Sequence, residues 1–150
     1  MSLGLRPILI IFEGVDKSGK TTILNEFNKK TNFSYVVLDR LTTSSKVYNE
    51  LFGRDRLKYY EDVERKLLES FNVLVVLCEC DTELNKKRLK KANETLPKQL
   101  ENVDMVKRKF YDEVEKSFIN FMLVDTTFKN IDECVEDVIK RVKGMEEDNG

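Results

Sequence analysis

Eight residues near the start of the chain match a complete pattern for binding phosphate groups. Residues 14–21 read G-V-D-K-S-G-K-T, which fits G-x-x-x-x-G-K-[ST]. The two glycines of this pattern let the backbone curl so that successive N–H groups point at phosphate oxygens. Lys20 would reach the β- and γ-phosphates of a nucleotide, and Thr21 would offer its hydroxyl to Mg²⁺. The positive end of a following helix would strengthen the attraction.

The segments on either side of this pattern have the periodicity that it requires. Pro7–Phe12 is a short apolar run suited to a buried parallel strand. In the segment Lys20–Lys30, apolar residues recur at helical intervals and lysines end the run. We therefore predict that polyphosphate binds at Gly14, Val15, Asp16, Lys17, Ser18, Gly19, Lys20, Thr21 and Thr22. The alternative is a Gly-rich turn that binds nothing.

The rest of the chain alternates short apolar runs with helical patterns. The runs predict strands at Pro7–Phe12, Tyr35–Leu38, Val73–Cys78 and Phe121–Val124. The patterns predict helices at roughly Lys20–Lys30, Asp55–Ser70, Thr82–Ala92, Val103–Phe118 and Ile131–Lys143. Such alternation is typical of an α/β fold with a small parallel sheet, about four strands, flanked by helices. Ligands bind these sheets at the carboxyl ends of the strands, where Glu13, Asp39 and Asp125 fall.

The composition limits the classes of protein that fit. At 150 residues the chain is expected to form one domain. Its net charge of −1 disfavours attraction to nucleic acid or to an anionic membrane. No apolar run approaches the length of a membrane span, and no signal-peptide pattern opens the chain.

The side chains that are rare or missing also carry information. The three cysteines do not have the spacing of a disulfide framework, so we expect a reduced, cytoplasmic protein. With no histidine and no C-x-x-C, a zinc site is not supported. The absence of histidine also excludes Ser-His-Asp and Cys-His catalysis.

Two apolar stripes near the end of the chain are interpreted as packing surfaces. One stripe holds Val103, Val106, Phe110, Val114 and Phe118. The other holds Ile131, Cys134, Val135, Val138, Ile139 and Val142. A hydrophobic groove for a partner is the alternative for either stripe. The tail from Glu146 to Gly150 is expected to fray.

An acid and an arginine stand together at the end of the second predicted strand. Asp39 could hold Mg²⁺, directly or through water. Arg40 has a fork-shaped cation that can hold a phosphate through two hydrogen bonds. A surface ion pair between them is the alternative, but a phosphate-binding pattern on a neighbouring strand favours a functional role.

At this point the sequence resembles the thymidylate kinase family. Residues 12–22, F-E-G-V-D-K-S-G-K-T-T, resemble its F-E-G-x-D-x-S-G-K-T-T opening. Residues 39–48, D-R-L-T-T-S-S-K-V-Y, run without gaps against its D-R-Y-x-x-S-S-x-A-Y segment. The resemblance implies a three-layer P-loop NTPase fold, with ATP as phosphoryl donor and Mg²⁺ as cofactor. It also implies that Asp16 approaches the acceptor sugar and that Arg88 either stacks on adenine or stays on the surface.

Two features depart from that family. Arg40 follows the first predicted helix by only about ten residues, where the family has a further strand and an R-E-P-like segment that grips the acceptor. The acceptor site is therefore either rebuilt from other residues or serves something other than a mononucleotide. The lid position, Ala92–Asn102, contains no arginine. Family members of that kind carry a basic residue in the loop, where this chain has Lys17.

Together with these residues, the resemblance implies an ATP-dependent kinase that acts on a nucleotide or a nucleoside. Its catalytic groups would be Lys17, Lys20, Asp39 and Arg40. Thr21 and Asp39 would bind Mg²⁺, and Glu13 is a candidate second-sphere acid. The lid charges Lys90, Lys91 and Lys98 are expected to be solvated.

Other functions stay open at the level of sequence. One is a P-loop kinase for another hydroxyl, such as a nucleic-acid 5′ end or a metabolite. Another is a non-catalytic, regulatory nucleotide-binding protein, although mere binding would not need Asp39 and Arg40. A GTPase is not supported, because no N-K-x-D motif is present. The sequence leaves a homodimer open.

Overall fold

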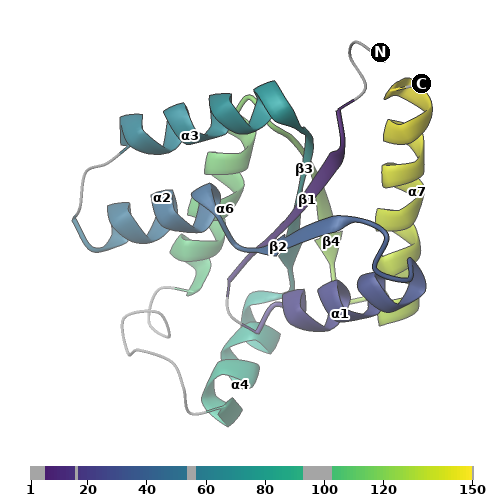
Figure 1. Cartoon of the computed structure of the whole chain (residues 1–150). Helices are drawn as coiled ribbons and strands as arrows, with labels where there is room; N and C mark the ends of the chain where they lie inside the picture. The colour runs from purple at the N-terminus through teal and green to yellow at the C-terminus, as the bar shows by residue number, and fades with distance from the viewer. Residues whose placement is uncertain (1–5, 16, 54–56, 93–102, 150) are drawn as a thin grey trace.

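The computed structural model describes residues 6–15, 17–53, 57–92 and 103–149 (Figure 1). In chain order the elements are β1 (Ile8–Glu13), α1 (Lys20–Lys30), β2 (Val36–Asp39), α2 (Thr42–Leu51), α3 (Leu57–Ser70), β3 (Asn72–Glu79), α4 (Thr82–Ala92), α6 (Val103–Lys116), β4 (Asn120–Asp125) and α7 (Ile131–Asn149). Strands thus alternate with one or two helices along the chain. This order confirms the predicted α/β class.

The four described strands form one parallel sheet in the order β2-β1-β3-β4. Every residue of β1 is buried, as are the inner residues of β3, because helices cover both faces of the sheet. The edge strands β2 and β4 are partly exposed. In the register between β1 and β2, Phe12 lies opposite Asp39. The two strand ends that carry the predicted site are therefore neighbours.

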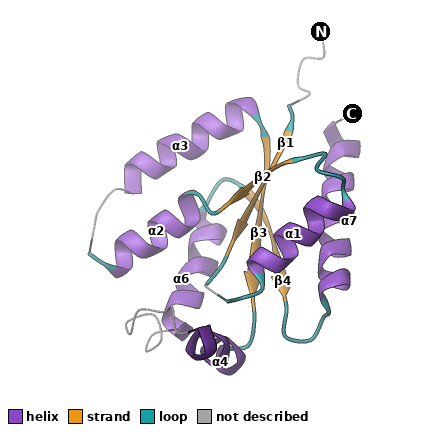
Figure 2. Cartoon of the chain, turned by 60° about the horizontal axis from the view of Figure 1, so that its bottom comes forward, coloured by secondary structure: helices purple, strands orange, loops and turns teal. Residues whose placement is uncertain are grey.

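Helices α1 and α7 cover one face of the sheet, and α2, α3 and α6 cover the other (Figures 1 and 2). Alternate residues of β1 point into the two cores. Ile10 and Phe12 pack on the side of α1 and α7. Leu9 and Ile11 pack on the side of α2 and α6. Helix α4 lies at the end where the strands finish (Figure 2). The fold is therefore three-layered, with α4 beside the edge that binds ligands in such sheets.

Most predicted elements are confirmed within two residues. The bounds of α1 and α4 are those predicted, and each strand lies within one residue of its predicted ends. The apolar stripe of α7 is buried against the sheet, as expected for packing. The three cysteines are buried, and none of them is in a disulfide. None of the described helices is both long and apolar enough to cross a bilayer.

Three expectations were wrong. No helix was predicted over Thr42–Leu51, where the structure has α2. Phe118 was assigned to a packing stripe, but it follows the end of α6 and is 55% exposed. The tail was expected to fray from Glu146, yet α7 continues to Asn149 and the hydroxyl of Tyr35 donates to the Glu146 carboxylate.

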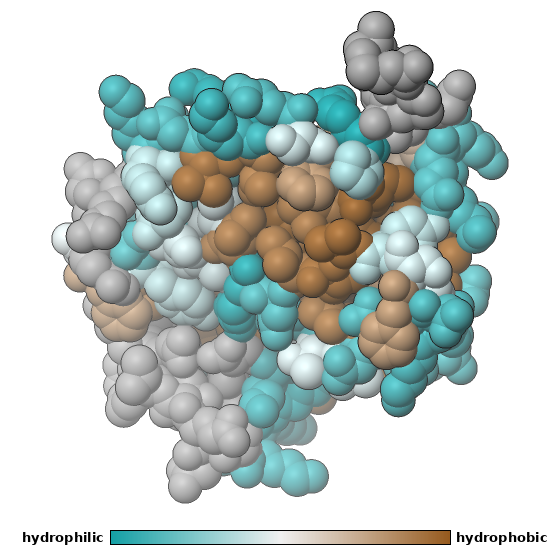
Figure 3. Space-filling view, viewed as in Figure 1, coloured by the Kyte–Doolittle hydropathy of each residue, from teal (hydrophilic) through white to brown (hydrophobic). Residues whose placement is uncertain are grey.

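The outer edge of β2 lies in an apolar face of the molecule. Figure 3 shows apolar side chains gathered at the centre of this face. Val36 of β2 is 53% exposed, and Leu38 and Leu41 are only partly buried. Residues 31–35 alone connect α1 to β2, and no strand lies beyond β2 in the part of the chain that is described. The sheet therefore ends at a short, exposed strand.

Candidate functional site

The phosphate-binding loop (residues 14–21) joins β1 to α1, and its two glycines are required by its shape. Gly14 has φ +145°, and a Cβ there would lie 2.2 Å from the carbonyl oxygen of Cys78. Gly19 has φ +96°, and a Cβ there would lie 2.8 Å from Cγ2 of Thr126. Any other residue would be strained and would clash. The loop is therefore pressed against the ends of β3 and β4.

One N–H group of the loop already has a partner within the loop, whereas the first N–H groups of α1 have none within their helix. The N–H of Ser18 donates to the carbonyl of Val15 at 3.2 Å and closes a turn, so it serves the loop itself. Helix α1 begins at Lys20, has Gly19 as N-cap with no side-chain cap, and carries no acid in its first turn. The first N–H groups of a helix have no partner within that helix. An anion would find these donors and the helix dipole together.

The hydroxyl of Ser18 is another unusual feature of the loop. Ser18 is 1% exposed, and its Oγ has no hydrogen-bond partner among the described residues. It lies close to Gly14, 3.0 Å from the position of an added Cβ. Buried polar groups are rarely left unpaired, because each one costs free energy. An unpaired hydroxyl here is consistent with a loop that is completed by a ligand.

The structure brings Lys20 and Asp39 together. The Lys20 ammonium, at the start of α1, forms an ion pair with Oδ1 of Asp39 at the end of β2. Lys20 is 7% exposed, whereas the Asp39 side chain is about half exposed. The ion pair of Asp39 is thus with Lys20, where the sequence suggested Arg40 as its alternative partner. Two of the predicted catalytic groups share one location.

Arg40 turns from the end of β2 towards the start of α2. It has φ +68°, and its N–H donates to the carbonyl of Phe12 at 2.9 Å. Its Nη1 donates to Oγ of Ser44 at 3.0 Å, and the guanidinium carbon lies 5.9 Å from the centre of the Tyr48 ring. These contacts fix the cation near the same sheet edge as Asp39.

Glu13 binds the start of α2. It is fully buried, and its carboxylate accepts hydrogen bonds from the N–H groups of Leu41 at 2.8 Å and Ser44 at 2.5 Å. The Ser44 hydroxyl donates to the same carboxylate at 3.0 Å while it accepts from Arg40. Burial raises the pKa of Glu13, although these hydrogen bonds oppose the shift. Glu13 therefore orients Arg40 through Ser44, a role that the sequence did not indicate.

Lys17 and Arg88 meet through the backbone of the loop. Lys17 is exposed and has φ +64°, and its carbonyl accepts a hydrogen bond from Nη1 of Arg88 at 3.1 Å. Arg88 of α4 therefore contacts the loop, which neither of its two expected roles included. Lys90 and Lys91 are exposed, as expected for solvated charges. Asp16, Lys98 and the predicted lid beyond Ala92 lie outside the described residues.

Sequence reasoning missed Thr126, which lies directly after β4. Its hydroxyl donates to the carbonyl of Ser18 at 2.7 Å, and its N–H donates to the carbonyl of Glu79 at 2.9 Å. The sequence offers only its position, directly after Asp125 at the carboxyl end of a strand. No pattern in the sequence distinguished it from the adjacent Thr127, so only the fold reveals the contact.

The residues present fit a magnesium ion that is bound together with a nucleotide. Such an ion takes one or two protein oxygens and completes its shell with phosphate oxygens and water. Thr21 is an exposed hydroxyl on the first turn of α1, and Asp39 is a partly exposed carboxylate next to Lys20. The described ranges contain no cluster of three or more His, Cys, Asp or Glu suited to a metal ion. The donor set therefore suits a nucleotide-bound ion better than a metal held by protein alone.

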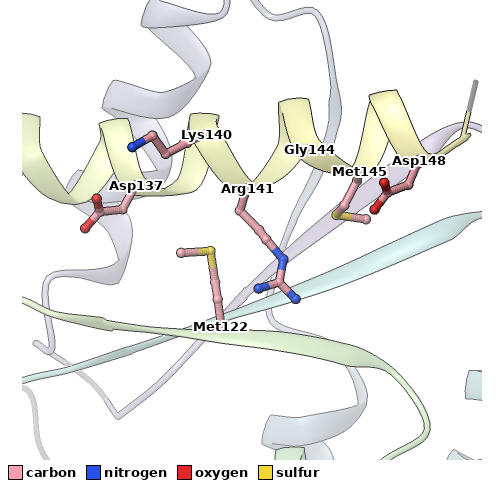
Figure 4. Close-up of a pocket in the computed structure, with 7 residues that line it drawn as sticks. All are labelled: Met122, Asp137, Lys140, Arg141, Gly144, Met145 and Asp148. Carbon is pink, nitrogen blue, oxygen red and sulfur yellow. The ribbon is translucent and has the colours of Figure 1, made fainter.

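A separate pocket of about 440 Å³ lies between β4 and α7 (Figure 4). Its lining residues are Met122, Asp137, Lys140, Arg141, Gly144, Met145 and Asp148. Met122 points from β4 towards α7, and the side chains of Arg141 and Met145 point back towards the sheet. None of the predicted site residues lines this pocket. It is therefore distinct from the candidate site at the phosphate-binding loop.

Comparison with known proteins identifies the fold. The sequence matches no protein-family model and no curated protein sequence. The structure is similar to the YorR protein of Bacillus subtilis in complex with phosphorylated GDP, with a TM-score of 0.75, 20% identity, and 93% of this chain and 98% of that chain covered.

Two further solved structures are similar. Thymidylate kinase from Candida albicans has a TM-score of 0.63 and 14% identity, with 97% of this chain and 94% of that chain covered. Deoxyadenosine kinase from M. mycoides with bound dATP has a TM-score of 0.57 and 16% identity, with 89% of this chain and 98% of that chain covered. The chain therefore has the fold of the P-loop nucleotide kinases, as the sequence predicted.

Proposed function

We propose that the protein is a kinase that transfers a phosphoryl group from ATP–Mg²⁺ to a nucleotide or a nucleoside. The observation that carries this proposal is the meeting of Lys20 from the phosphate-binding loop with Asp39, the last residue of β2. Arg40 follows directly and is held at the same sheet edge. A loop that only bound a nucleotide would not need Asp39 and Arg40 beside it. The named activities of the thymidylate and deoxyadenosine kinases support the proposal.

On the donor side, the loop and the first turn of α1 would bind the phosphates. Phosphate oxygens would accept from the N–H groups of the helix start and from Lys20. Binding would draw the Lys20 ammonium away from Asp39 and towards the β- and γ-phosphates. Asp39 and Thr21 would then be available to hold Mg²⁺, which would offset the negative charge of the phosphates. The Ser18 hydroxyl would gain the partner that it lacks within the described residues.

On the acceptor side, cations would surround the group in transfer. Phosphoryl transfer depends mainly on in-line positioning and on charge stabilisation around the equatorial oxygens. Lys17 is exposed on the loop, and Arg40 is fixed by Ser44 and Tyr48. We assign Lys17 to the oxygens of the donor and Arg40 to the phosphate or hydroxyl end of the acceptor. An oxygen of the acceptor would bond to the γ-phosphorus while the bond from that phosphorus to the β–γ bridging oxygen breaks and ADP leaves. With a nucleoside acceptor this oxygen is a hydroxyl, whose proton would pass to water; with a nucleotide acceptor it is a phosphate oxygen.

The proposal is tested by removing each cation and measuring binding and transfer separately. We expect Lys20→Ala to weaken ATP–Mg²⁺ binding and to reduce transfer at least a hundredfold, because a charge-assisted contact to the reacting phosphate is lost. Arg40→Ala should reduce transfer while ATP affinity changes little. Lys29→Ala, at the exposed end of α1, is the matched control and should behave as wild type. Unchanged transfer in both site variants would refute the assignment.

A further inference from the structure

Two hydrogen bonds from outside the phosphate-binding loop hold consecutive peptide groups of that loop. Thr126 donates its hydroxyl to the carbonyl of Ser18 at 2.7 Å. Arg88 donates Nη1 to the carbonyl of Lys17 at 3.1 Å, and the same nitrogen lies 3.5 Å from Oγ1 of Thr126. One donor comes from the turn after β4 and the other from α4. The loop is thus held at adjacent positions by two elements that are distant in sequence.

Thr126 is itself firmly placed. It is buried, and its own N–H donates to the carbonyl of Glu79 at the end of β3. Its methyl group faces Gly19, which has no side chain that could collide with it. The hydroxyl of Thr126 therefore meets the loop from a rigid base formed by two strand ends.

The geometry of the peptide bond gives these contacts a consequence. In a trans peptide the C=O of one residue and the N–H of the next point in opposite directions. A carbonyl of Ser18 fixed towards Thr126 therefore sends the N–H of Gly19 away from Thr126. A carbonyl of Lys17 fixed towards Arg88 likewise orients the N–H of Ser18, which closes the turn onto Val15. Both bonds select one conformation of the loop.

The conformation at Lys17 makes such support necessary. Lys17 has φ +64°, a left-handed conformation that is unfavourable for residues other than glycine. Strained backbone persists only where surrounding contacts hold it. The bond from Arg88 is made to the carbonyl of this same residue. It stabilises the conformation from which the exposed Lys17 side chain departs.

We propose that Thr126 and Arg88 are positioning residues that hold the loop in the conformation that binds polyphosphate. Thr126 aims the N–H of Gly19 at the incoming phosphate, and Arg88 sets the place of Lys17. Neither residue touches the reacting atoms in this role. The proposal rests on the proposed function for its effect on transfer, but its effect on phosphate binding stands independently of any acceptor.

The first test substitutes Thr126 and, separately, its neighbour Thr127. Thr126→Val keeps the shape of the side chain and removes the donor, and Thr126→Ser keeps the donor. Thr127→Val is the matched control, because Thr127 accepts from the N–H of Asp81 at 2.6 Å and forms no hydrogen bond with the described residues of the loop. We expect Thr126→Val to weaken the binding of ATP–Mg²⁺ and of tripolyphosphate about tenfold, the effect of one lost hydrogen bond of roughly 1.4 kcal/mol. Thr126→Ser and Thr127→Val should bind as wild type.

The second test concerns Arg88 and separates positioning from stacking on the base. Arg88→Met is compared with Lys87→Met, an exposed neighbour on α4. Positioning predicts that Arg88→Met weakens tripolyphosphate as much as ATP and lowers kcat more than it raises KM. If Arg88 served to stack on adenine, ATP binding would fall while tripolyphosphate binding stayed unchanged, and the inference would be overturned for this residue.

The outcomes separate this inference from the proposed function. A wild-type protein that binds tripolyphosphate but phosphorylates no acceptor would defeat the proposed function, and the affinity measurements would still decide the inference. Wild-type affinity for tripolyphosphate in both Thr126→Val and Arg88→Met would overturn the inference even if the enzyme were an active kinase. Should Thr126→Val fail to fold, Arg88→Met against Lys87→Met still decides it.

Discussion

Replacement of Lys46 by methionine would leave the Glu64 carboxylate buried without its cation. The Lys46 ammonium of α2 lies 2.8 and 3.0 Å from the two carboxylate oxygens of Glu64 on α3. The two side chains are only 5% and 2% exposed. Ser117, which follows α6, donates its hydroxyl to the same carboxylate at 3.2 Å. The pair therefore connects the three helices on one face of the sheet.

The size of the effect follows from burial. Loss of one partner of a buried ion pair typically costs about 3–5 kcal/mol of unfolding free energy, because the other charge stays desolvated. For a chain of this length, each kcal/mol lowers the melting temperature by about 2–4 °C. Lys46→Met should therefore melt roughly 6–20 °C below wild type. Lys46→Met combined with Glu64→Gln removes the stranded charge and should recover most of the loss.

Urea unfolding followed by circular dichroism measures these free energies directly. The matched control is Lys66→Met, which removes an exposed ion pair with Glu69 at 3.6 Å on the same helix as Glu64. Exposed pairs contribute about 0–1 kcal/mol, so this control should differ little from wild type. If Lys46→Met were as stable as Lys66→Met, the buried pair would not stabilise α2. If the double variant were no better than Lys46→Met, an uncompensated charge would not be the cause.

Three other measurements test separate parts of the structure. Burial raises the pKa of the Cys78 thiol to about 12, so Cys78 should react slowly with a thiol reagent in the folded protein and fully in guanidinium. Rapid labelling of Cys78 in the native state would contradict this burial. Burial also raises the pKa of Glu113 above its ordinary 4.5, so its stabilising contribution is complete below pH 4.5 and is lost as the pH rises through the folded-state pKa. In urea unfolding, Glu113→Gln should flatten this decline of the unfolding free energy with pH, and an unchanged slope would refute the assignment. Gly19→Ala should destabilise the fold by at least about 1 kcal/mol through strain and its clash with Thr126, whereas Gly144→Ala in open space on α7 should be neutral or stabilising; equal effects would contradict the loop geometry.

The sheet and its loop could be predicted from the sequence because their signals are local. β1 and β3 are buried on both faces and therefore read as continuous apolar runs. The loop pattern predicted the start of α1 at Lys20. Single acids at the ends of three predicted strands indicated the ligand-binding edge of the sheet. The ion pair of Lys20 with Asp39 forms because β1 and β2 are neighbours in the sheet.

Helix α2 could not be predicted, since its stability comes from tertiary contacts. Its sequence T-T-S-S-K-V-Y-N-E-L is poor in strong helix formers. The N–H groups at its start donate hydrogen bonds to Glu13 of β1. Lys46 in its middle is buried against Glu64, although lysine normally indicates a solvated face. Local propensity therefore pointed away from the structure that long-range hydrogen bonds and an ion pair impose.

The contacts of Thr126 and Arg88 with the loop were hidden for a similar reason. Thr126 lies 108 residues from Ser18 in the sequence, and Arg88 lies 71 residues from Lys17. No periodicity links positions so far apart, and a single threonine or arginine has no distinguishing pattern. Only the order of the strands places the ends of β3 and β4 beneath the loop.

We propose that the phosphate-binding loop and the Asp39–Arg40 segment form one phosphoryl-transfer site. The most direct measurement is ADP release from ATP–Mg²⁺ by the wild-type protein against deoxynucleosides, their monophosphates and 5′-hydroxyl oligonucleotides. We expect turnover with a nucleoside or a nucleotide, and loss of that turnover when Lys20 is replaced by alanine. Tight ATP binding without turnover on any nucleoside or nucleotide would contradict it.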